Sequence, residues 1–474
     1  MQTGEGIQVD ELTSAHPWLR DPALEVSAVG SLALYRACAG AGLPLPPAPA
    51  DLDLAWRLGA DEGRAFLAGR GLEAAATPGN EARGTLATRL GERRVEITTY
   101  RGGGSDADER IRRDGCLRDM TIGALYWRLW DDRIEDPVDG LADWREGRVR
   151  ACGLATDRIQ EHPVRALRYL RKTVELGFVL ETSTRRGVEA TTDLVARKLL
   201  PDALAEELRR VLARCTSPGA FFQMCQEARL LAKVLPEVAP IFDGRPAGRM
   251  RWHPEVSQAL HMVLALKAAA GLAAAHGLDD RDRHLFLMGV LCHDLGKGGT
   301  DEDEMPSHPG HEAGGVEFID RLFRRVPALG DKGVERFCKV AARNHLLLER
   351  LRQLRPGTLV DLWDRDLRTL EDRFDLLARV VRCDREGRLT SADLGLPQPP
   401  QAECPEPAAA LEARILADLL ELDTILRAVS GHEAAALHPG DPAALREHLR
   451  RARCDALTQS GFLDGHDRQK AAAR

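Results

Sequence analysis

Two hydrophobic periods divide the chain into an N-terminal and a C-terminal part. Between residues 24 and 150, runs that alternate polar with apolar residues are interspersed with runs in which apolar residues recur every three or four positions. The first pattern is typical of strands and the second of helices. From about residue 155 the helical period continues almost throughout. The pattern predicts an α+β fold in which a small mixed α/β head precedes a long all-α portion.

Five segments of the head carry these patterns most clearly. Strands are predicted for LEVSAVG (24–30), ADLDLAW (50–56) and RRVEITTY (93–100), and helices for SLALYRACAG (31–40) and DMTIGALYWRL (119–129). A strand that ends in a small-residue turn and leads straight into a helix offers backbone N–H groups to a phosphate. Such turns are common, so this one identifies a function only together with other residues.

Proline and glycine gather at two places, PAGRMRWHPE (246–255) and LGLPQPPQAECPEP (394–407). Residues of this kind interrupt helices and mark connections between folded units. With the change of pattern near residue 150, they predict four parts: a head at 20–150, a helical region at 151–248, a second helical domain at 249–393 and a helical tail at 405–474.

Composition narrows the class of protein. The 474 residues carry a formal net charge of −7, so a nucleic-acid site has to be a local arginine patch rather than a basic surface. The ten cysteines form no C-x-x-C pair, which argues against a zinc site or a compact disulfide framework. The N-terminus does not have the pattern of a signal peptide, and no apolar run approaches about eighteen residues. We expect a cytoplasmic protein that does not enter a membrane.

Two carboxylates in the second predicted strand point to metal chemistry. Side chains alternate along a strand, so Asp51 and Asp53 share one face while Leu52 and Leu54 occupy the other. Two carboxylates a few Å apart repel each other unless a cation lies between them, and a divalent metal ion meets that need. A solvated edge strand is the alternative, and for an isolated pair it is the commoner one. Glu96, in the third predicted strand, adds a third carboxylate.

The order of these segments resembles the nucleotidyltransferase superfamily, in particular the tRNA nucleotidyltransferase (CCA-adding) and bacterial poly(A) polymerase family. The resemblance covers most of the chain. It implies template-independent addition of nucleotides from CTP and ATP to the 3′ ends of tRNA or another RNA. It continues through GTLATRL (84–90), LRDMTIGALYW (117–127), DPVDGLADWREGRVR (136–150), QEHPVRALRYLRKTVELGF (160–178) and VSGHEAAALHPGDPAALREHLRRA (429–452).

The resemblance also implies roles for individual residues. Two aspartates would hold two Mg²⁺ ions at the reacting phosphate, with a glutamate as the third catalytic carboxylate. A small-residue turn would lie beside the nucleotide, and an Arg-Asp pair would handle ribose and phosphate. A helix further on would read the edge of the incoming base. The implied catalytic residues are Asp51, Asp53 and Glu96, and the implied binding residues are Gly30, Ser31, Arg118, Asp119, Glu161, His162, Arg165 and Arg168.

The sequence departs from the family pattern at four places. Serine replaces the second glycine of the turn at Ser31, Leu34-Tyr35 stand where Arg-Asp is usual, and Gly123 replaces an asparagine. The base-reading motif Glu-Asp-x-x-Arg has His162 at the position of its aspartate. A neutral histidine offers one hydrogen-bond acceptor where a carboxylate offers several. Altered nucleotide choice, relaxed choice and a decayed transferase are therefore the open alternatives.

Histidines and aspartates form a second pattern in the helical portion. The segment LFLMGVLCHDLGKG (285–298) places a His-Asp pair at the end of an apolar helix, where burial without a partner is costly. A lone buried histidine is usually a satisfied core residue, and His253 and His308 are interpreted so. Six other residues, in their order, resemble the ligands of the HD-type metal phosphohydrolases fused to some CCA-adding enzymes: His261, His293, Asp294, His311, His345 and Asp384.

This second resemblance implies that the first three of these residues hold one divalent ion together with Asp384. His311 and His345 would support a second ion or contact the substrate phosphate. Mixed imidazole and carboxylate ligands fit Ni²⁺, Mn²⁺, Co²⁺ or Fe²⁺ better than Mg²⁺. Lys297, just after the pair, either neutralises substrate phosphate or is a cation at the end of its helix.

Three functions remain open on the sequence alone. The first is a nucleotidyltransferase for RNA 3′ ends, of the tRNA CCA-adding or repairing kind, with a fused metal-dependent HD phosphohydrolase. In the second, the phosphohydrolase is active and the head only binds RNA or nucleotide. The third is a helical RNA-binding or regulatory protein with vestigial sites. The ordered sets of acids and histidines favour the first.

Overall fold

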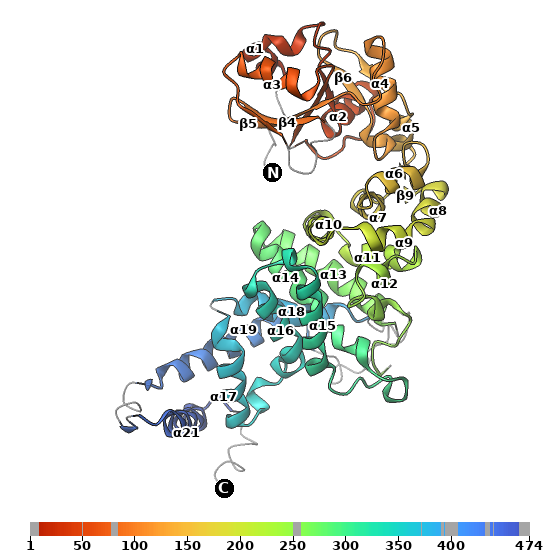
Figure 1. Cartoon of the computed structure of the whole chain (residues 1–474). Helices are drawn as coiled ribbons and strands as arrows, with labels where there is room; N and C mark the ends of the chain where they lie inside the picture. Colours follow the sequence, from red (N-terminus) through yellow and green to blue (C-terminus); the bar gives the residue numbers. More distant parts are fainter. Residues whose placement is uncertain are drawn as a thin grey trace. The chain divides into compact units, whose positions relative to one another are not determined.

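The computed structural model divides the chain into two compact units, residues 1–199 and residues 200–474 (Figure 1). Strands occur in the first unit, and the described part of the second unit is helical, which confirms the predicted α+β class. The bounds of the four parts predicted from the sequence stay predictions. The structure describes residues 9–49, 51–76, 84–249, 257–370, 372–389, 393, 406–431, 437–438 and 440–463.

A mixed sheet forms the centre of the first unit, with seven strands over the described residues in the order β3-β4-β5-β2-β1-β6-β7. Strands β2 and β5 run parallel, and the other neighbours in this sheet pair antiparallel. The predicted strands at 24–30, 50–56 and 93–100 are thus confirmed. The strands are β1 (Ser27–Val29), β2 (Leu52–Trp56), β3 (Ala74–Ala76), β4 (Thr85–Leu90), β5 (Arg93–Thr99), β6 (Tyr126–Arg128) and β7 (Ile134–Glu135).

Alternation along β2 and β5 separates the core from the polar face of the sheet. Leu52 and Leu54 are buried in the same apolar cluster as Val95 and Ile97. Because successive side chains on a strand point to opposite faces, Asp53 lies on the other side of the sheet. The burial of four aliphatic side chains therefore fixes the orientation of the acidic residue between them.

The remaining elements of the first unit are mostly helical. A short parallel pair, β8 (Arg148–Val149) with β9 (Val179–Leu180), lies among them. The helices are α1 (Val9–Ala15), α2 (Ser31–Ala41), α3 (Ala60–Ala68), α4 (Ala107–Cys116), α5 (Gly140–Arg145), α6 (Ala155–Glu161), α7 (Arg165–Leu176), α8 (Thr182–Ala190) and α9 (Thr192–Lys198), with 3₁₀ turns η1 (Pro17–Arg20) and η3 (Thr121–Gly123).

The helix predicted over residues 119–129 is wrong. Only the 3₁₀ turn η3 forms there, and the following residues are strand β6, which pairs with β1. A short apolar run fits the helical and the buried-strand period equally well, so the pattern alone does not separate them. Tyr126 and Arg128 are buried at the sheet, and this tertiary environment selects the strand.

The second unit is built around α14. Its C-terminal residues, from Leu285 to Cys292, are buried, and it packs against α10, α13, α16 and α18. The helices are α10 (Pro201–Arg214), α11 (Pro218–Glu227), α12 (Leu231–Val234), α13 (Gln258–Ala275), α14 (Asp280–Cys292), α15 (His311–Arg325), α16 (Lys332–Leu348), α17 (Pro356–Arg365), α18 (Phe374–Glu386), α19 (Ala408–Ala428) and α21 (Pro442–Ser460). The 3₁₀ turns are η4 (Ala239–Phe242), η5 (Leu295–Gly299), η6 (Glu302–Glu304), η7 (Pro327–Leu329), η8 (Leu351–Gln353) and η9 (Leu367–Thr369).

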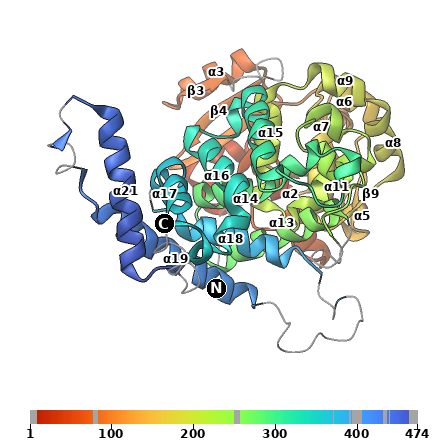
Figure 2. The ribbon, with the colours of Figure 1, turned by 90° about the horizontal axis from the view of Figure 1, so that it is seen from below.

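The C-terminal helices α19 and α21 pack on the helices that precede them. Figure 2 shows α21 alongside α17 and α19. Two arginines of α21 form ion pairs with aspartates of α17: Arg450 Nε lies 3.0 Å from Asp361 Oδ1, and Arg453 Nη1 lies 2.9 Å from Asp364 Oδ1. The described helices of the predicted tail therefore pack on the rest of the second unit.

One helix among the described residues, α13, is long and apolar enough to cross a membrane by length and composition. The sequence predicted no run of this kind. Its window has a mean hydropathy of 1.4, and 56% of that window is buried inside the protein. Burial of this extent is what a core helix of a folded domain shows.

Turn η5 approaches α15 so closely that only glycine fits at one position. A Cβ atom on Gly296 would lie 1.8 Å from the carbonyl oxygen of His311 and 2.5 Å from the backbone nitrogen of Gly315. Both obstacles are backbone atoms, so no side-chain movement relieves the clash. A Cβ atom on Gly314, one residue before Gly315, would have its nearest neighbour 3.9 Å away, which is ordinary van der Waals contact.

We therefore expect Gly296→Ala to lower the free energy of unfolding by about 1–3 kcal/mol, the usual cost of overpacking a core. Urea unfolding followed by circular dichroism measures the change. Gly314→Ala is the matched control, and its added methyl group in a helix should leave stability unchanged or slightly higher. Equal unfolding midpoints for the two variants would contradict the close approach of η5 to α15.

Candidate functional site

Parallel pairing of β2 with β5 places two predicted carboxylates opposite each other. Asp53 is the register partner of Glu96. Both lie on the sheet face away from the aliphatic core, because residues at alternate positions share a face. Asp51 is exposed and lies directly before the first residue of β2. The predicted proximity of Asp53 and Glu96 is confirmed, and Asp51 lies at the adjacent end of the strand.

The turn between β1 and α2 lies beside these carboxylates. Gly30 has a φ of +66°, in the left-handed region that favours glycine. A Cβ atom on Gly30 would lie 3.6 Å from Oδ2 of Asp53. Ser31, the first residue of α2, is exposed. The start of a helix and a pair of carboxylates thus meet at one place, as the sequence predicts.

Asp53 carries an unfavourable charge in this setting. Burial, followed by the nearby Glu96 carboxylate, raises the pKa of Asp53 to about 6, against the opposing positive charge of Arg118. Asp51 acts in the same direction as Glu96. A carboxylate whose ionised form is disfavoured gains more than an exposed one when a cation binds beside it.

Arg118 and Asp119 lie in the turn after α4, where the sequence predicts the start of a helix. The Arg118 guanidinium donates from Nη2 to Oδ2 of Asp114 at 3.0 Å and from Nε to the Tyr126 hydroxyl at 2.9 Å. Asp114 is buried and also accepts from Nε of Arg101 at 2.6 Å. This network fixes the position of Arg118 beside the sheet.

Asp119 connects that turn to helix α7. Its Oδ2 accepts from Nη1 of Arg168 at 2.6 Å, and its carbonyl oxygen accepts from the Tyr169 hydroxyl at 2.9 Å. Burial opposes its ionisation, but Arg168 more than offsets this and holds the pKa of Asp119 below its ordinary value. The predicted ribose pair and the predicted base-reading helix are therefore in direct contact.

The start of α7 is held by a second ion-pair network. Arg165 is buried, and its Nη1 donates to Glu161 Oε2 at 2.6 Å and to the carbonyl oxygen of Arg158 at 3.0 Å. Arg158 also pairs with Glu161, at 2.7 Å. His162 is half-buried at the C-terminus of α6. The structure brings these residues together, but Arg165 is part of the scaffold rather than a fully exposed reader.

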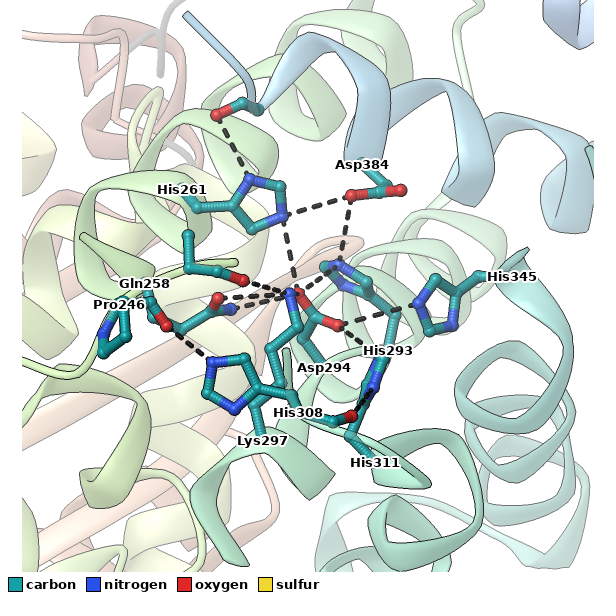
Figure 3. Close-up of polar contacts among 12 residues, drawn as sticks. Pro246, Gln258, His261, His293, Asp294, Lys297, His308, His311, His345 and Asp384 are labelled. Atoms are coloured by element: carbon teal, nitrogen blue, oxygen red, sulfur yellow. Dashed lines mark hydrogen bonds and ion pairs between the residues drawn. The ribbon is translucent and has the colours of Figure 1, made fainter. Parts of the chain in front are cut away.

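Asp294 lies at the centre of the second predicted site (Figure 3). Its Oδ2 is 3.6 Å from Nε2 of His261 and 3.3 Å from Nε2 of His293. Its Oδ1 is 3.4 Å from Nε2 of His311 and 3.6 Å from Nε2 of His345. These histidines come from α13, the end of α14, α15 and α16, and all four are buried.

Asp384, from α18, completes the group on the His261 and His293 side. Its Oδ1 is 3.2 Å from Nε2 of His261 and 3.8 Å from Nε2 of His293. Its other oxygen accepts from Nη2 of Arg388 at 2.6 Å. Burial disfavours the charge of Asp384, but Arg388 and then His261 offset it, so its pKa is well below the ordinary value. All six predicted residues therefore converge.

A shared backbone pattern aims the four imidazoles at the centre. In each ring Nδ1 lies within hydrogen-bond distance of a carbonyl oxygen, at 2.7–3.2 Å. A carbonyl only accepts, so Nδ1 carries the proton and Nε2 presents its lone pair. This arrangement is typical of metal-binding histidines. The four carbonyls belong to Gly387, Val290, His308 and Ala342, facing His261, His293, His311 and His345 respectively.

Two further residues of the cluster act on Asp294. Lys297 is buried, and its Nζ lies 2.8 Å from Asp294 Oδ2. Gln258 is buried and donates from Nε2 to the same oxygen at 3.0 Å. Burial raises the pKa of Asp294, but Lys297 and then His293 outweigh it, so its pKa lies well below the ordinary value and the carboxylate stays ionised. Burial lowers the pKa of His345 to about 3, which keeps this ring neutral.

The sequence did not predict a role for Gln258. For Lys297 it predicted either a contact with substrate phosphate or a cation at the end of its helix. A signal for Gln258 exists, because a polar residue three positions before His261 shares its helix face. The interpretation of His308 as a core residue is confirmed, since both ring nitrogens have partners, Thr300 Oγ1 and the Pro246 carbonyl oxygen. His253 lies outside the described residues.

These residues fit a divalent metal ion. Two groups of three, His261 with His293 and Asp294, and Asp294 with His311 and His345, each bring their ligand atoms within 4.8 Å of one another. Nε2 of His293, Nε2 of His311 and Oδ1 of Asp294 are buried without a hydrogen-bond partner among the described residues. Burying such atoms is costly unless a ligand satisfies them.

Comparison with known proteins agrees with both sites. The chain is 33% identical to the multifunctional CCA protein of Xanthomonas euvesicatoria over 305 residues, which cover 63% of this chain and 71% of that protein. It is 31% identical to the one of Xanthomonas campestris over 344 residues, covering 71% and 81%. The chain belongs to the multifunctional CCA protein family. The family resemblance inferred from the sequence is therefore confirmed.

Two further family matches fall on the parts of the chain that carry the sites. Residues 43–150 match the poly A polymerase head domain, and residues 259–369 match the HD domain. The first match includes the carboxylates of β2 and β5. The second includes five residues of the histidine–aspartate cluster, while Asp384 follows its end.

Solved structures show the same fold. A CCA-adding enzyme in complex with ATP covers 95% of this chain and 89% of its own length, with a TM-score of 0.60 and 15% identity. The Thermotoga maritima CCA-adding enzyme complexed with tRNA gives a TM-score of 0.58, also at 15% identity, covering 95% of this chain and 91% of its own. At this identity the likeness concerns the fold alone.

We expect Asp53→Asn to stabilise the metal-free protein near neutral pH. In the folded chain this carboxyl keeps its proton up to a pKa of about 6, whereas in the unfolded chain it ionises near its ordinary value. Wild-type stability therefore falls as the pH rises from about 4 to 6, by up to about 3 kcal/mol. Thermal melting of both proteins across this range measures the difference, which should vanish at about pH 4.

Asp51→Asn is the matched control, because Asp51 is exposed at the end of the same strand. Because Asp51 contributes less than Glu96 to the raised pKa of Asp53, Asp51→Asn should raise the melting temperature near neutral pH by less than Asp53→Asn does. If Asp53→Asn raised the melting temperature equally in acidic and in neutral solution, the stabilisation would not come from the charge of Asp53.

Proposed function

We propose that this chain adds nucleotides from CTP and ATP to the 3′ end of tRNA, and that its histidine–aspartate cluster hydrolyses phosphoesters. The observation that carries the first activity is the parallel register that sets Asp53 opposite Glu96 beside the Gly30 turn. Membership of the multifunctional CCA protein family supports the same assignment. That this chain acts in the cytoplasm and does not enter a membrane stays a prediction.

Asp51, Asp53 and Glu96 are the residues we assign to two Mg²⁺ ions. Mg²⁺ bound there supplies charge stabilisation at the α-phosphorus and lowers the pKa of the attacking 3′-hydroxyl. Gly30 leaves the space beside Asp53 open, where a larger residue would occupy it. The start of α2 directs backbone N–H groups towards phosphate oxygens.

The turn at Arg118 and Asp119 positions the nucleotide in this proposal. Asp114 and the Tyr126 hydroxyl hold the Arg118 guanidinium in one orientation, so little side-chain freedom is lost when a substrate binds. Asp119 contacts Arg168 and thereby couples the ribose pair to the base-reading helix. A shift of that helix would move both together.

Base selection falls to His162 with Arg165 and Arg168. Arg165 is buried and fixed by Glu161 and by the carbonyl oxygen of Arg158, so it holds the start of α7 in place for His162 and Arg168. His162 replaces the carboxylate expected by family resemblance and offers fewer acceptors to an exocyclic amine. We infer that this chain distinguishes cytosine and adenine from uracil less strongly than a carboxylate at this position would.

The histidine–aspartate cluster is the proposed hydrolytic centre. His261, His293, Asp294 and Asp384 would hold one divalent transition ion such as Ni²⁺, Mn²⁺, Co²⁺ or Fe²⁺, and His311 with His345 a second one on the other side of Asp294. Such an ion supplies Lewis acidity and a bound water of lowered pKa. The imidazoles are buried away from bulk water, and backbone carbonyls at Nδ1 leave each Nε2 directed at the centre.

A decayed head that only binds RNA is not favoured. The half-buried Asp53 carboxyl, whose pKa is raised by burial and by the nearby Glu96, reduces the stability of the fold when it ionises. Such a loss of stability is typical of a functional site, since substitution of the acid by an uncharged residue would remove the loss. The family relatives and the matched head domain point the same way.

Separate variants of the two centres test this proposal. Asp53→Ala should reduce incorporation of labelled CMP and AMP into tRNA lacking its 3′ end by at least about 10³-fold, since it removes an electrostatic element of the reacting centre. The same protein should still bind Co²⁺ and hydrolyse a phosphodiester such as bis-p-nitrophenyl phosphate. Asp294→Ala should show the reverse pattern. The measurements are gel-resolved incorporation, Co²⁺ absorbance and p-nitrophenol release.

Asp61→Ala is the matched control, because Asp61 lies at the surface in α3. It should retain both activities. Folded wild-type protein that incorporates no nucleotide with Mg²⁺ or Mn²⁺ would defeat the transferase half. Wild-type protein that neither binds Co²⁺ nor releases p-nitrophenol would defeat the hydrolase half.

His162→Asp tests the assignment of base selection. A carboxylate at this position accepts hydrogen bonds from the amino group of cytosine or adenine but not from uracil, which lacks one. We expect the ratio of kcat/KM for CTP to that for UTP to rise by about tenfold, the value of one hydrogen bond. An unchanged ratio in a folded, active variant would remove His162 from base recognition.

A further inference from the structure

Gln258 occupies an unusual position for a carboxamide. It is the first residue of α13, and it is fully buried. Its backbone N–H donates to the carbonyl oxygen of Arg245 at 3.1 Å, which fixes the start of the helix. A buried carboxamide is costly unless its N–H₂ and C=O groups both find partners.

Both ends of this carboxamide are bound within the histidine–aspartate cluster, as Figure 3 shows. Nε2 donates to Asp294 Oδ2 at 3.0 Å, and Oε1 accepts from Lys297 Nζ at 3.3 Å. The reverse orientation would set oxygen against a carboxylate and N–H against an ammonium group. The charges of Asp294 and Lys297 therefore permit one orientation of Gln258 only.

Lys297 has all its donors engaged by this arrangement. Its ammonium group lies 2.8 Å from Asp294 Oδ2, 2.8 Å from the carbonyl oxygen of Ala247 and 3.3 Å from Gln258 Oε1. An ammonium group has three donors, so these three acceptors satisfy it. In this structure Lys297 is buried and is a partner of Asp294, a role that the sequence did not predict.

The two oxygens of Asp294 are therefore inequivalent. Oδ2 accepts from Gln258 and Lys297 and faces His261 and His293. Oδ1 has no hydrogen-bond partner among the described residues and faces His311. Rotation of the carboxylate would break the contacts at Oδ2, so these contacts fix the plane in which both oxygens meet the imidazoles.

We propose that Gln258 is a positioning residue of this metal centre: by joining Asp294 to Lys297, it sets the orientation in which Asp294 meets a metal ion. The inference rests on the proposed metal-binding function of the cluster and adds a residue that lies outside the ligand set. Gln258 does not itself contact the ion in this role. Partners of this kind alter metal affinity by about 10–100-fold when removed.

The test is a titration of the metal-free, full-length protein with Co²⁺, followed by visible absorbance. Gln258→Met keeps the length of the side chain and removes both hydrogen bonds, so we expect a Kd about 10–100-fold higher and a changed absorption band. Gln258→Leu, whose side chain has a different shape, should raise the Kd for Co²⁺ by a similar factor. Circular dichroism establishes that each variant is folded. Gln223→Met is the matched control, because Gln223 donates to Glu227 on α11, outside the cluster.

A double-mutant cycle separates positioning from a general packing effect. If Gln258 acts through Asp294, adding Gln258→Met to Asp294→Asn, which keeps one side-chain oxygen for the ion, causes a smaller further loss of Co²⁺ affinity than the same change in the wild type. Folded Gln258→Met and Gln258→Leu proteins with wild-type affinity, or losses that add in the double variant, would overturn the inference. Wild-type protein that binds no Co²⁺ would overturn the metal centre itself, and is thereby distinguished from a failure of Gln258 alone.

Discussion

A carboxylate removed from water requires a positive charge nearby, and the two units meet this requirement in opposite ways. In the second unit, Asp294 has the Lys297 ammonium group 2.8 Å away and four imidazoles around it. In the first, Asp53 faces the like-charged Glu96, and Arg118 is bound by Asp114. One centre is thus compensated within the protein, while the other favours cations that arrive with a substrate.

This difference matches the chemistry proposed for each unit. A nucleoside triphosphate brings Mg²⁺ with it, so the charge of these carboxylates would be compensated when the ion arrives with the substrate. An ion that stays bound through many hydrolytic cycles needs nitrogen ligands and a rigid, buried environment. Backbone carbonyls aimed at each Nδ1 supply that rigidity, and the close approach of η5 to α15 at Gly296 depends on the same packing.

Much of the fold and of the two candidate sites could be predicted from the sequence, because the patterns that indicate them lie within short segments. The alternation of Asp51 and Asp53 with leucines predicts a strand whose acids share a face, and the ordered histidines predict a convergent set. The contacts of Arg118 and Gln258 could not be predicted, since each depends on tertiary packing, against Tyr126 for one and Asp294 for the other. The segment 119–129 shows the same limit, because pairing of β6 with β1 overrides its helical spacing.

The central claim is that one chain assembles two separate metal centres from residues far apart in sequence. Crystals of the full-length protein grown with Mn²⁺, measured at the manganese absorption edge, test it most directly. We predict anomalous peaks both among Asp51, Asp53 and Glu96 and among the histidines around Asp294. A peak only at the histidines, with the side chains of Asp51 and Asp53 directed into solvent, would contradict the account.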